Sequence, residues 1–220
     1  MAKHGESKHT KRSSVTNRVV VPRKKYKYYF RPLPSSHKKQ YSIALLGFLR
    51  DIMKIAKTAK EASFLLKQGY VKLDGKIIKD KKREVGFGDL VSVRGKNFKV
   101  WLDERGKLIS APDEEGGERK KLKVISKHLD KGGAQILSLS DGSNIKMGDK
   151  SVNVNDSVVI DLKQRKIEKV LPMEQGKEVI VFMGANAGNV GRVKEISGKE
   201  VEVELKEREI KASIDSCMVL

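Results

Sequence analysis

The second half of the chain is built from short runs in which apolar and polar residues alternate. Such runs cover residues 122–129, 134–139, 157–162 and 167–171, and glycine-containing turns separate several of them. Strict alternation predicts strands with one buried face. Several short strands with turn signals at this spacing favour a small barrel or sandwich. Because no helical pattern follows residue 118, we predict that residues 111–220 are all-β.

The last 45 residues continue this pattern. Residues 179–183, 190–196 and 201–205 read as strands, and in the last of these Val201 and Val203 alternate with glutamates. Residues 111–118, with the sequence APDEEGGE, combine a proline, two glycines and four acids. That composition interrupts the apolar pattern and predicts a linker.

The first half contains the only helical signals. Between Ser42 and Ala56 apolar residues recur at helical spacing, which predicts an amphipathic helix. Arg50, Lys54 and Lys57 would then stack on another face of this helix.

A second helix is predicted to begin at Thr58, because Thr58 and Glu61 have the spacing of a capping box. Gly69 fits the left-handed position that ends it. Residues 70–78 form a predicted hairpin around the turn Asp74-Gly75. Further strands are predicted at residues 90–93, 99–102 and 107–110.

Residues 1–40 hold twelve Lys and Arg against one acid, Glu6, and include three prolines. We predict an extended arm that is disordered alone and orders on a polyanion. Its apolar run Val19–Val21 and its aromatic cluster at residues 26–30 would either dock onto the folded part or stack on nucleic-acid bases.

The distribution of charge indicates the class of partner. Residues 1–110 carry 28 Lys and Arg against 9 Asp and Glu, whereas residues 111–220 carry 19 of each, so the whole formal net charge of +19 lies in the first half. A segregated positive field attracts polyanions, and nucleic acid is the first candidate.

Other classes of protein are disfavoured. The longest apolar run, residues 43–49, is far shorter than the roughly 20 residues of a membrane span, and the N-terminus lacks the apolar region of a secretory signal. Cys217 is the only cysteine, which excludes an internal disulfide or a thiolate-rich zinc site and fits a reducing cytosol. No cluster of His, Cys or acids has catalytic or metal-ligand spacing, so the residues give no sign of a catalytic or metal site.

Residues 184–193, with the sequence GANAGNVGRV, form a glycine-rich loop after an apolar strand. The loop lacks the Gly-Lys-Ser/Thr of a Walker motif and the spacing of a dinucleotide fingerprint. The residues that follow it read as a strand, so no helix N-terminus is available for a phosphate. We therefore reject nucleotide binding. The remaining interpretations are a structural hairpin loop or an RNA contact by Arg192 and exposed amides.

These motifs together resemble a known family. The segment KTAKEASFLLKQGYVKLDGKII resembles the alpha-L RNA-binding motif, and the glycine loop with its following strand resembles a KOW motif. The wider stretch from Ser35 through VGFGDLVSV resembles ribosomal protein S4e of archaea and eukaryotes, and the opening residues His9–Arg12 agree with that family. By this resemblance Gly188 would permit close backbone approach in the KOW loop.

The resemblance implies an α+β fold with a basic arm (1–40), a small helical alpha-L domain (41–110), a central β domain (111–171) and a KOW domain (172–220). It implies a structural constituent of the small ribosomal subunit, located in the cytoplasm. Its partners would be small-subunit rRNA and neighbouring small-subunit proteins, with no membrane, small-molecule substrate or cofactor. Two alternatives remain open: a KOW-containing transcription elongation factor, and an RNA-modifying enzyme that carries the alpha-L motif.

Recognition of folded RNA would rest on shape and phosphates. The candidate RNA-binding residues are the arm and helix cations, the arm tyrosines and two KOW-loop positions. They are Lys8, Lys11, Arg12, Tyr26, Tyr28, Tyr29, Lys38, Lys39, Arg50, Lys54, Lys57, Lys60, Lys67, Lys72, Lys76, Gly188 and Arg192.

Overall fold

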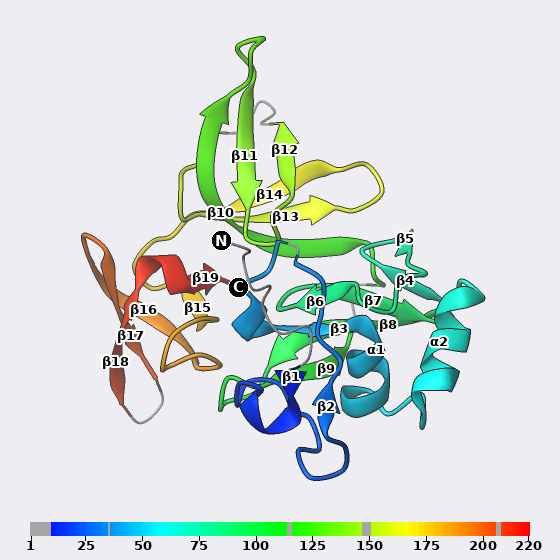
Figure 1. Ribbon diagram of the computed structural model, residues 1–220. Helices are drawn as coiled ribbons and strands as arrows, with labels where there is room; N and C mark the ends of the chain where they lie inside the picture. The colour runs from blue at the N-terminus through cyan, green and yellow to red at the C-terminus, as the bar shows by residue number, and fades with distance from the viewer. Residues whose placement is uncertain (1–9, 35, 114–115, 147–150, 206–207) are drawn as a thin grey trace, which may run out of the picture.

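In the computed structural model, three five-stranded antiparallel sheets each pack on an apolar core of their own (Figure 1). The structure describes residues 10–34, 36–113, 116–146, 151–205 and 208–220. Among these residues both α-helices lie in the first half, which confirms the predicted α+β class with a helical unit followed by two small all-β modules.

The first sheet has the strand order β5-β4-β7-β8-β9. Its strands are β4 (Val71–Leu73), β5 (Lys76–Ile77), β7 (Leu90–Val93), β8 (Lys96–Leu102) and β9 (Leu108–Pro112). The predicted turn between β4 and β5 is present, with positive φ at Asp74 (48°) and Gly75 (78°). This is the backbone geometry that matches the twist of two paired strands.

Helix α2 (Ala59–Lys67) lies at the side of this sheet (Figure 1), shares its core and begins with the predicted capping box. The backbone N–H of Glu61 donates to Thr58 Oγ1 (3.2 Å), and the Glu61 carboxylate accepts from the backbone N–H of Thr58 (3.2 Å). Gly69 ends the segment with φ 76°. The apolar face of the helix, with Ala62, Leu65 and Leu66, is buried.

The predicted helix at residues 42–56 is wrong in its extent. Ser42–Ala44 instead forms strand β3, which pairs with β6 (Glu84–Gly86). Helix α1 (Leu45–Gly47) and the π-helical turn η3 (Phe48–Ile52) follow, and the helical segment ends there. Residues 42–49 are all buried. Apart from Ser42 and Gly47 they carry apolar side chains, and a short apolar run without a clear period does not distinguish a strand from a helix.

The arm is an ordered part of the fold from Thr10 on, contrary to the prediction of disorder. It contains β1 (Thr10–Lys11), the 3-10 turn η1 (Arg12–Ser14), β2 (Tyr28–Tyr29) and the 3-10 turn η2 (Lys39–Tyr41). Val15, Val19 and Val21 are buried in the same core as the first sheet. The apolar run Val19–Val21 was predicted either to dock onto the folded part or to stack on bases, and the structure shows that it docks.

The central sheet has the order β12-β11-β10-β13-β14. Its strands are β10 (Arg119–Leu129), β11 (Gln135–Leu139), β12 (Asn144–Lys146), β13 (Ser157–Asp161) and β14 (Lys166–Leu171). The first half of β10 pairs with β13 and its second half with β11, with a bulge between Val124 and Ser126. This one long strand is therefore the central strand and joins the two halves of the sheet.

The last sheet has the order β18-β17-β16-β15-β19. Its strands are β15 (Glu178–Val181), β16 (Val190–Ser197), β17 (Glu200–Glu204), β18 (Glu209–Ser213) and β19 (Cys217–Val219), with the 3-10 turn η4 (Ile214–Ser216) before β19. Figure 1 shows this module beside the first sheet, with the central sheet above both.

Candidate nucleic-acid interface

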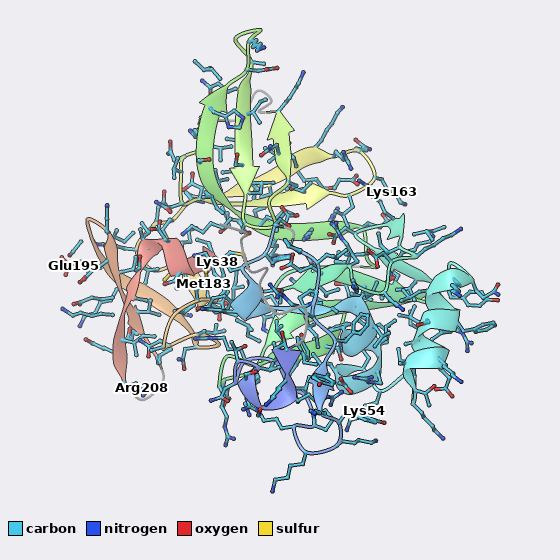
Figure 2. The ribbon with its side chains drawn as sticks, viewed as in Figure 1. Lys38, Lys54, Lys163, Met183, Glu195 and Arg208 are labelled. Atoms are coloured by element: carbon cyan, nitrogen blue, oxygen red, sulfur yellow. The ribbon has the colours of Figure 1, made fainter. Side chains whose placement is uncertain are left out.

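Helix α2 and the segment before it carry a group of exposed cations. Lys60 and Lys67 lie on the helix, and Lys54 and Lys57 lie on the chain that leads into it; all four side chains are exposed. Figure 2 places Lys54 at the outer edge of this unit. The Glu61 carboxylate of the capping box also accepts the backbone N–H of Lys57 (2.6 Å), and the buried face of α2 holds the helix in place. The backbone of Lys57, Lys60 and Lys67 is therefore fixed by a rigid scaffold, whereas Lys54 lies outside it.

The predicted stack of Arg50, Lys54 and Lys57 on one helix face is not formed. The helical segment ends at Ile52, and Lys54 has a left-handed φ of 56°. Arg50 instead donates two hydrogen bonds to the Asp51 carboxylate, at 2.9 and 2.6 Å. Arg50 is therefore held beside Asp51, while Lys54 and Lys57 project from an irregular segment.

Arg12 has an internal role that its sequence context did not reveal. Its side chain is 2% exposed and donates to the carbonyl oxygens of Tyr28 (3.1 Å) and Pro22 (2.8 Å). Its guanidinium also lies 3.7 Å from Asp51. Burial lowers the pKa of Arg12, and Asp51 offsets part of this effect. The burial does not support Arg12 as a phosphate contact on the free surface.

The three arm tyrosines differ in exposure. Tyr26 and Tyr28 are 50% and 49% exposed, whereas Tyr29 packs against the first core. The Tyr29 hydroxyl is buried, and burial raises its pKa. Only Tyr26 and Tyr28 thus offer ring surface to a base. They line a hollow of 510 Å³ together with Arg50 and the start of α2.

The glycine loop of the last module contacts the first half of the chain. Gly188 is buried with φ 95°, and a Cβ there would overlap the carbonyl oxygen of Asp103. The Arg18 guanidinium donates to the Gly184 carbonyl oxygen, and the Gly184 N–H donates to the Tyr41 hydroxyl (3.2 Å). Gly188 does permit a close backbone approach, but the neighbour is this chain itself.

The remaining candidates are dispersed. Lys11 and Lys38 are exposed on the arm, and Arg192 is exposed on β16 with Glu178 and Glu204 opposite it on the neighbouring strands. Lys8 and the side chain of Lys39 lie outside the described residues.

Lys72 and Lys76, on the β4–β5 hairpin, line a second and larger groove of 740 Å³ between the first and central sheets. Three further cations line the same groove, namely Arg83, Lys163 and Arg165. Figure 2 shows Lys163 on the central module, above the hairpin. The sequence did not indicate Lys163 and Arg165, because the second half of the chain has no net charge and a neutral total conceals a local cluster. Arg83 lies in the basic first half, where no local pattern distinguished it from the other cations.

A buried ion cluster joins the modules at the floor of this groove. The Lys120 ammonium donates to Asp89 (2.8 Å), Asp74 (2.9 Å) and Asp141 (3.1 Å), and its side chain is 1% exposed. His37 of the arm lies 3.0 Å from the second oxygen of Asp89. Arm, first sheet and central sheet therefore meet at one lysine.

The charges of this cluster shift the pKa values of its members. Burial opposes the ionised forms, but Lys120 and His37 hold the pKa of Asp89 below its usual value, and Lys120 does the same for Asp141. Burial opposes a charged His37, yet Asp89 raises its pKa. At Asp74 burial outweighs the lysine, so the pKa of Asp74 is raised.

Within the described ranges, no group of three or more His, Cys, Asp or Glu side chains could hold a metal ion. In the same part of the chain, no helix has the length and apolarity that crossing a membrane requires.

Comparison with known proteins identifies this arrangement. The capped helix and the hairpin, with their exposed lysines, lie within residues 48–91, and this segment matches the S4 domain model. The two β modules follow it in the chain. Residues 94–167 match the model of the ribosomal family S4e.

Individual relatives extend the match over most of the chain. The small ribosomal subunit protein eS4 of Thermoplasma volcanium is 32% identical over 192 residues, which cover 87% of this chain and 82% of that protein. The eS4 protein of Methanocaldococcus jannaschii is 34% identical, over 91% of this chain and 86% of its own length. The chain belongs to the ribosomal family S4e, which confirms the resemblance drawn from its motifs.

The fold agrees with a solved structure. The crystal structure of the 30S ribosomal protein S4e from Thermoplasma acidophilum superposes with a TM-score of 0.71 at 28% identity, and the match covers 82% of this chain and 95% of that one.

Proposed function

We propose that this chain is a structural constituent of the small ribosomal subunit and binds small-subunit rRNA through its basic first half. The observation that carries the proposal is the placement of the charge. All of the net charge of +19 lies in residues 1–110, and four lysines around the rigid helix α2 are exposed. Cations fixed on a folded scaffold gain from counterion release at each phosphate that they neutralise.

The proposed RNA-contacting residues are those predicted positions whose side chains are exposed. They are Lys11, Tyr26, Tyr28, Lys38, Lys54, Lys57, Lys60, Lys67, Lys72, Lys76 and Arg192. Arg50 lies at the wall of the tyrosine hollow and belongs with them. Arg12, Tyr29 and Gly188 would support this surface from within, since they are buried or packed against the chain itself.

The division into an arm (1–40), an alpha-L unit (41–110), a central module (111–171) and a KOW module (172–220) is part of the proposal. In this scheme the central module is a spacer or protein-facing unit, and neighbouring small-subunit proteins are its partners. The protein would act in the cytoplasm, on the ribosome, without turnover chemistry or a small-molecule substrate. The elongation-factor and modifying-enzyme alternatives are less supported, because the S4e relatives match the chain across all its modules.

The test is a filter-binding titration of the full chain with small-subunit rRNA over a range of salt concentrations. Replacing Lys54, Lys57 and Lys60 together by Gln should weaken binding and reduce the magnitude of the salt slope by about two to three, roughly one per lost phosphate contact. The matched control replaces three exposed lysines of the central module, Lys127, Lys131 and Lys169. This control has the same net charge and should leave the slope nearly unchanged. Equal losses in both triple variants would contradict the proposal, since total charge rather than placement would then govern binding.

A further inference from the structure

The hollow between the arm and the alpha-L unit is more than a basic surface. It has a volume of 510 Å³, within the range of about 300–1,000 Å³ that is typical of sites for small ligands. The rings of the arm form one part of its wall, and the start of α2 forms another. Its lining residues are Arg12, Tyr26, Lys27, Tyr28, Tyr29, Phe30, Arg50, Thr58 and Ala59, and none of them is acidic.

The walls of this hollow are held in place by the fold. The Arg12 backbone N–H donates to the Lys27 carbonyl oxygen (3.1 Å), and its side chain donates to the carbonyl oxygens of Pro22 and Tyr28. These three bonds fasten both ends of the loop that carries Tyr26. Asp51 in turn holds Arg50 in a two-point hydrogen bond. A site whose side chains are already fixed loses little conformational entropy on binding.

Cations surround the exposed rings. The Arg12 guanidinium lies 4.9 Å and the Arg50 guanidinium 5.8 Å from the centre of the Tyr26 ring, and the Lys27 ammonium lies 5.4 Å from the centre of the Tyr28 ring. Half of the Tyr26 surface remains open to solvent. An aromatic ring that is half open to solvent, with guanidinium groups over it, suits a ligand that is planar and apolar on one side and anionic on the other.

We propose that this hollow binds one unpaired nucleotide of the RNA, with its base stacked on Tyr26 and its phosphate beside Arg50 and Lys27. A paired A-form helix offers phosphates and 2′-hydroxyls but no free base face, so a stacking site selects single-stranded loops, bulges or ends. Stacking tolerates any base, because every base has a π-face. The inference rests on the proposed RNA-binding function and adds that the arm recognises an unpaired base rather than charge alone.

The experiment measures binding of the full chain to two RNA octamers that carry the same number of phosphates. One is oligoadenylate, and the other has abasic ribose at every position. The unaltered protein should bind oligoadenylate about 5- to 100-fold more tightly than the abasic octamer, as base–aromatic stacking allows. The variant Tyr26→Ala should lose most of this preference, and Tyr26→Phe should keep it because the ring remains.

The matched control is Tyr70→Ala. Tyr70 is 47% exposed and has the Arg94 guanidinium 5.6 Å from its ring centre, but it does not line the hollow. The Tyr70→Ala variant should therefore prefer oligoadenylate over the abasic octamer as strongly as the unaltered protein does. Thermal unfolding of each variant verifies that the fold is retained, and both tyrosines are exposed enough for alanine to be tolerated.

The outcomes separate this inference from the function on which it rests. If Tyr26→Ala binds both octamers as the unaltered protein does, or if the unaltered protein does not prefer bases, the nucleotide site is refuted; the lysine-dependent salt slope with rRNA would still support the proposed function. A second titration uses polyglutamate; if Tyr26→Ala weakens binding of polyglutamate but not of oligoadenylate, the hollow takes an acidic protein partner and the inference is overturned. Absence of any salt-dependent rRNA binding would instead refute the proposed function.

Discussion

Two buried lysines on strand β10 join the central module to its two neighbours, and they do so in opposite ways. Lys120 reaches toward the first sheet and donates to Asp74 and Asp89 there and to Asp141 of its own module. Lys123 reaches toward the last module, where the one contact of its ammonium that the structure gives is the carbonyl oxygen of Ile214. Each residue is 1% exposed. Lys120 therefore lies in a junction that is rich in opposite charge, whereas Lys123, three positions further on, lies in a junction that is poor in it.

The pKa values of the two lysines express this difference. Burial disfavours the charged form of both. At Lys120 the charges of Asp89, Asp74 and Asp141 outweigh burial, and the pKa is raised. At Lys123 burial prevails over the weaker influence of Cys217 and Asp215, and the pKa is lowered to about 8. A buried charge thus stabilises a junction only when enough opposite charge is buried with it.

Replacement of Lys120 by Met should have the largest effect. The change leaves three carboxylates buried without their common partner, and loss of one partner from a buried ionic group costs about 3–5 kcal/mol of the free energy of unfolding. Urea denaturation at pH 7 measures this. Lys121→Met, at the neighbouring half-buried position, is the control and should change stability by less than about 1 kcal/mol. A loss of that small size for Lys120→Met would show that the cluster contributes nothing to the first junction.

A third contact, between the last module and the first, depends on packing rather than charge. Gly188→Ala places a Cβ against the Asp103 carbonyl at a φ of 95°, and we expect a loss of about 3 kcal/mol from overpacking and backbone strain. Gly198→Ala shares a positive φ of 62° but has nothing within 4 Å of its Cβ, so it should cost only about 1 kcal/mol. Thermal unfolding measures the loss of stability in both variants. Equal losses would mean that the glycine loop around Gly188 does not pack tightly against the first module.

The smallest effect concerns Lys123 and depends on pH. Because its folded pKa of about 8 lies below the 10.5 of a free lysine, the folded state releases the proton first, and stability should rise with pH by about 2 kcal/mol between pH 8 and pH 10. Lys123→Met should lack this rise and be at least as stable at pH 7. Burial also raises the pKa of Cys217, and this makes stability fall with pH in the unaltered protein and in the variant alike. The measured quantity is therefore the difference in the free energy of unfolding between the two proteins, determined by urea denaturation at each pH. A difference that does not change between pH 8 and pH 10 would refute the prediction.

The sequence predicted most strands of the β modules and the capped helix, because each depends on neighbours a few residues away. The alternation in residues 122–129 and 157–162 corresponds to β10 and β13, and the spacing of Thr58 and Glu61 to the cap of α2. Prediction failed at residues 42–44, which form a strand instead of the start of a helix. These residues and the apolar residues that follow them up to Leu49 are all buried, so the pattern has no clear period, and pairing of β3 with the distant strand β6 decides the conformation.

The site was predicted in part for a similar reason. Exposed lysines beside α2 followed from a local pattern, and the segregated charge indicated a polyanion. The burial of Arg12 did not follow, because its partners Pro22, Tyr28 and Asp51 are up to 39 positions away along the chain. No local signal distinguishes an arginine that meets phosphate from one that meets backbone carbonyls.

The amino-acid sequence by itself determined the class of fold and the family and indicated a polyanion as partner, since periodicity, turn residues and net charge are properties of short segments and of composition. Only the tertiary structure decided which cations remain on the surface, which tyrosines are open, and how the modules are joined. Those outcomes depend on burial, and burial of a charged group is stable only where residues remote in sequence supply the opposite charge or the hydrogen bonds.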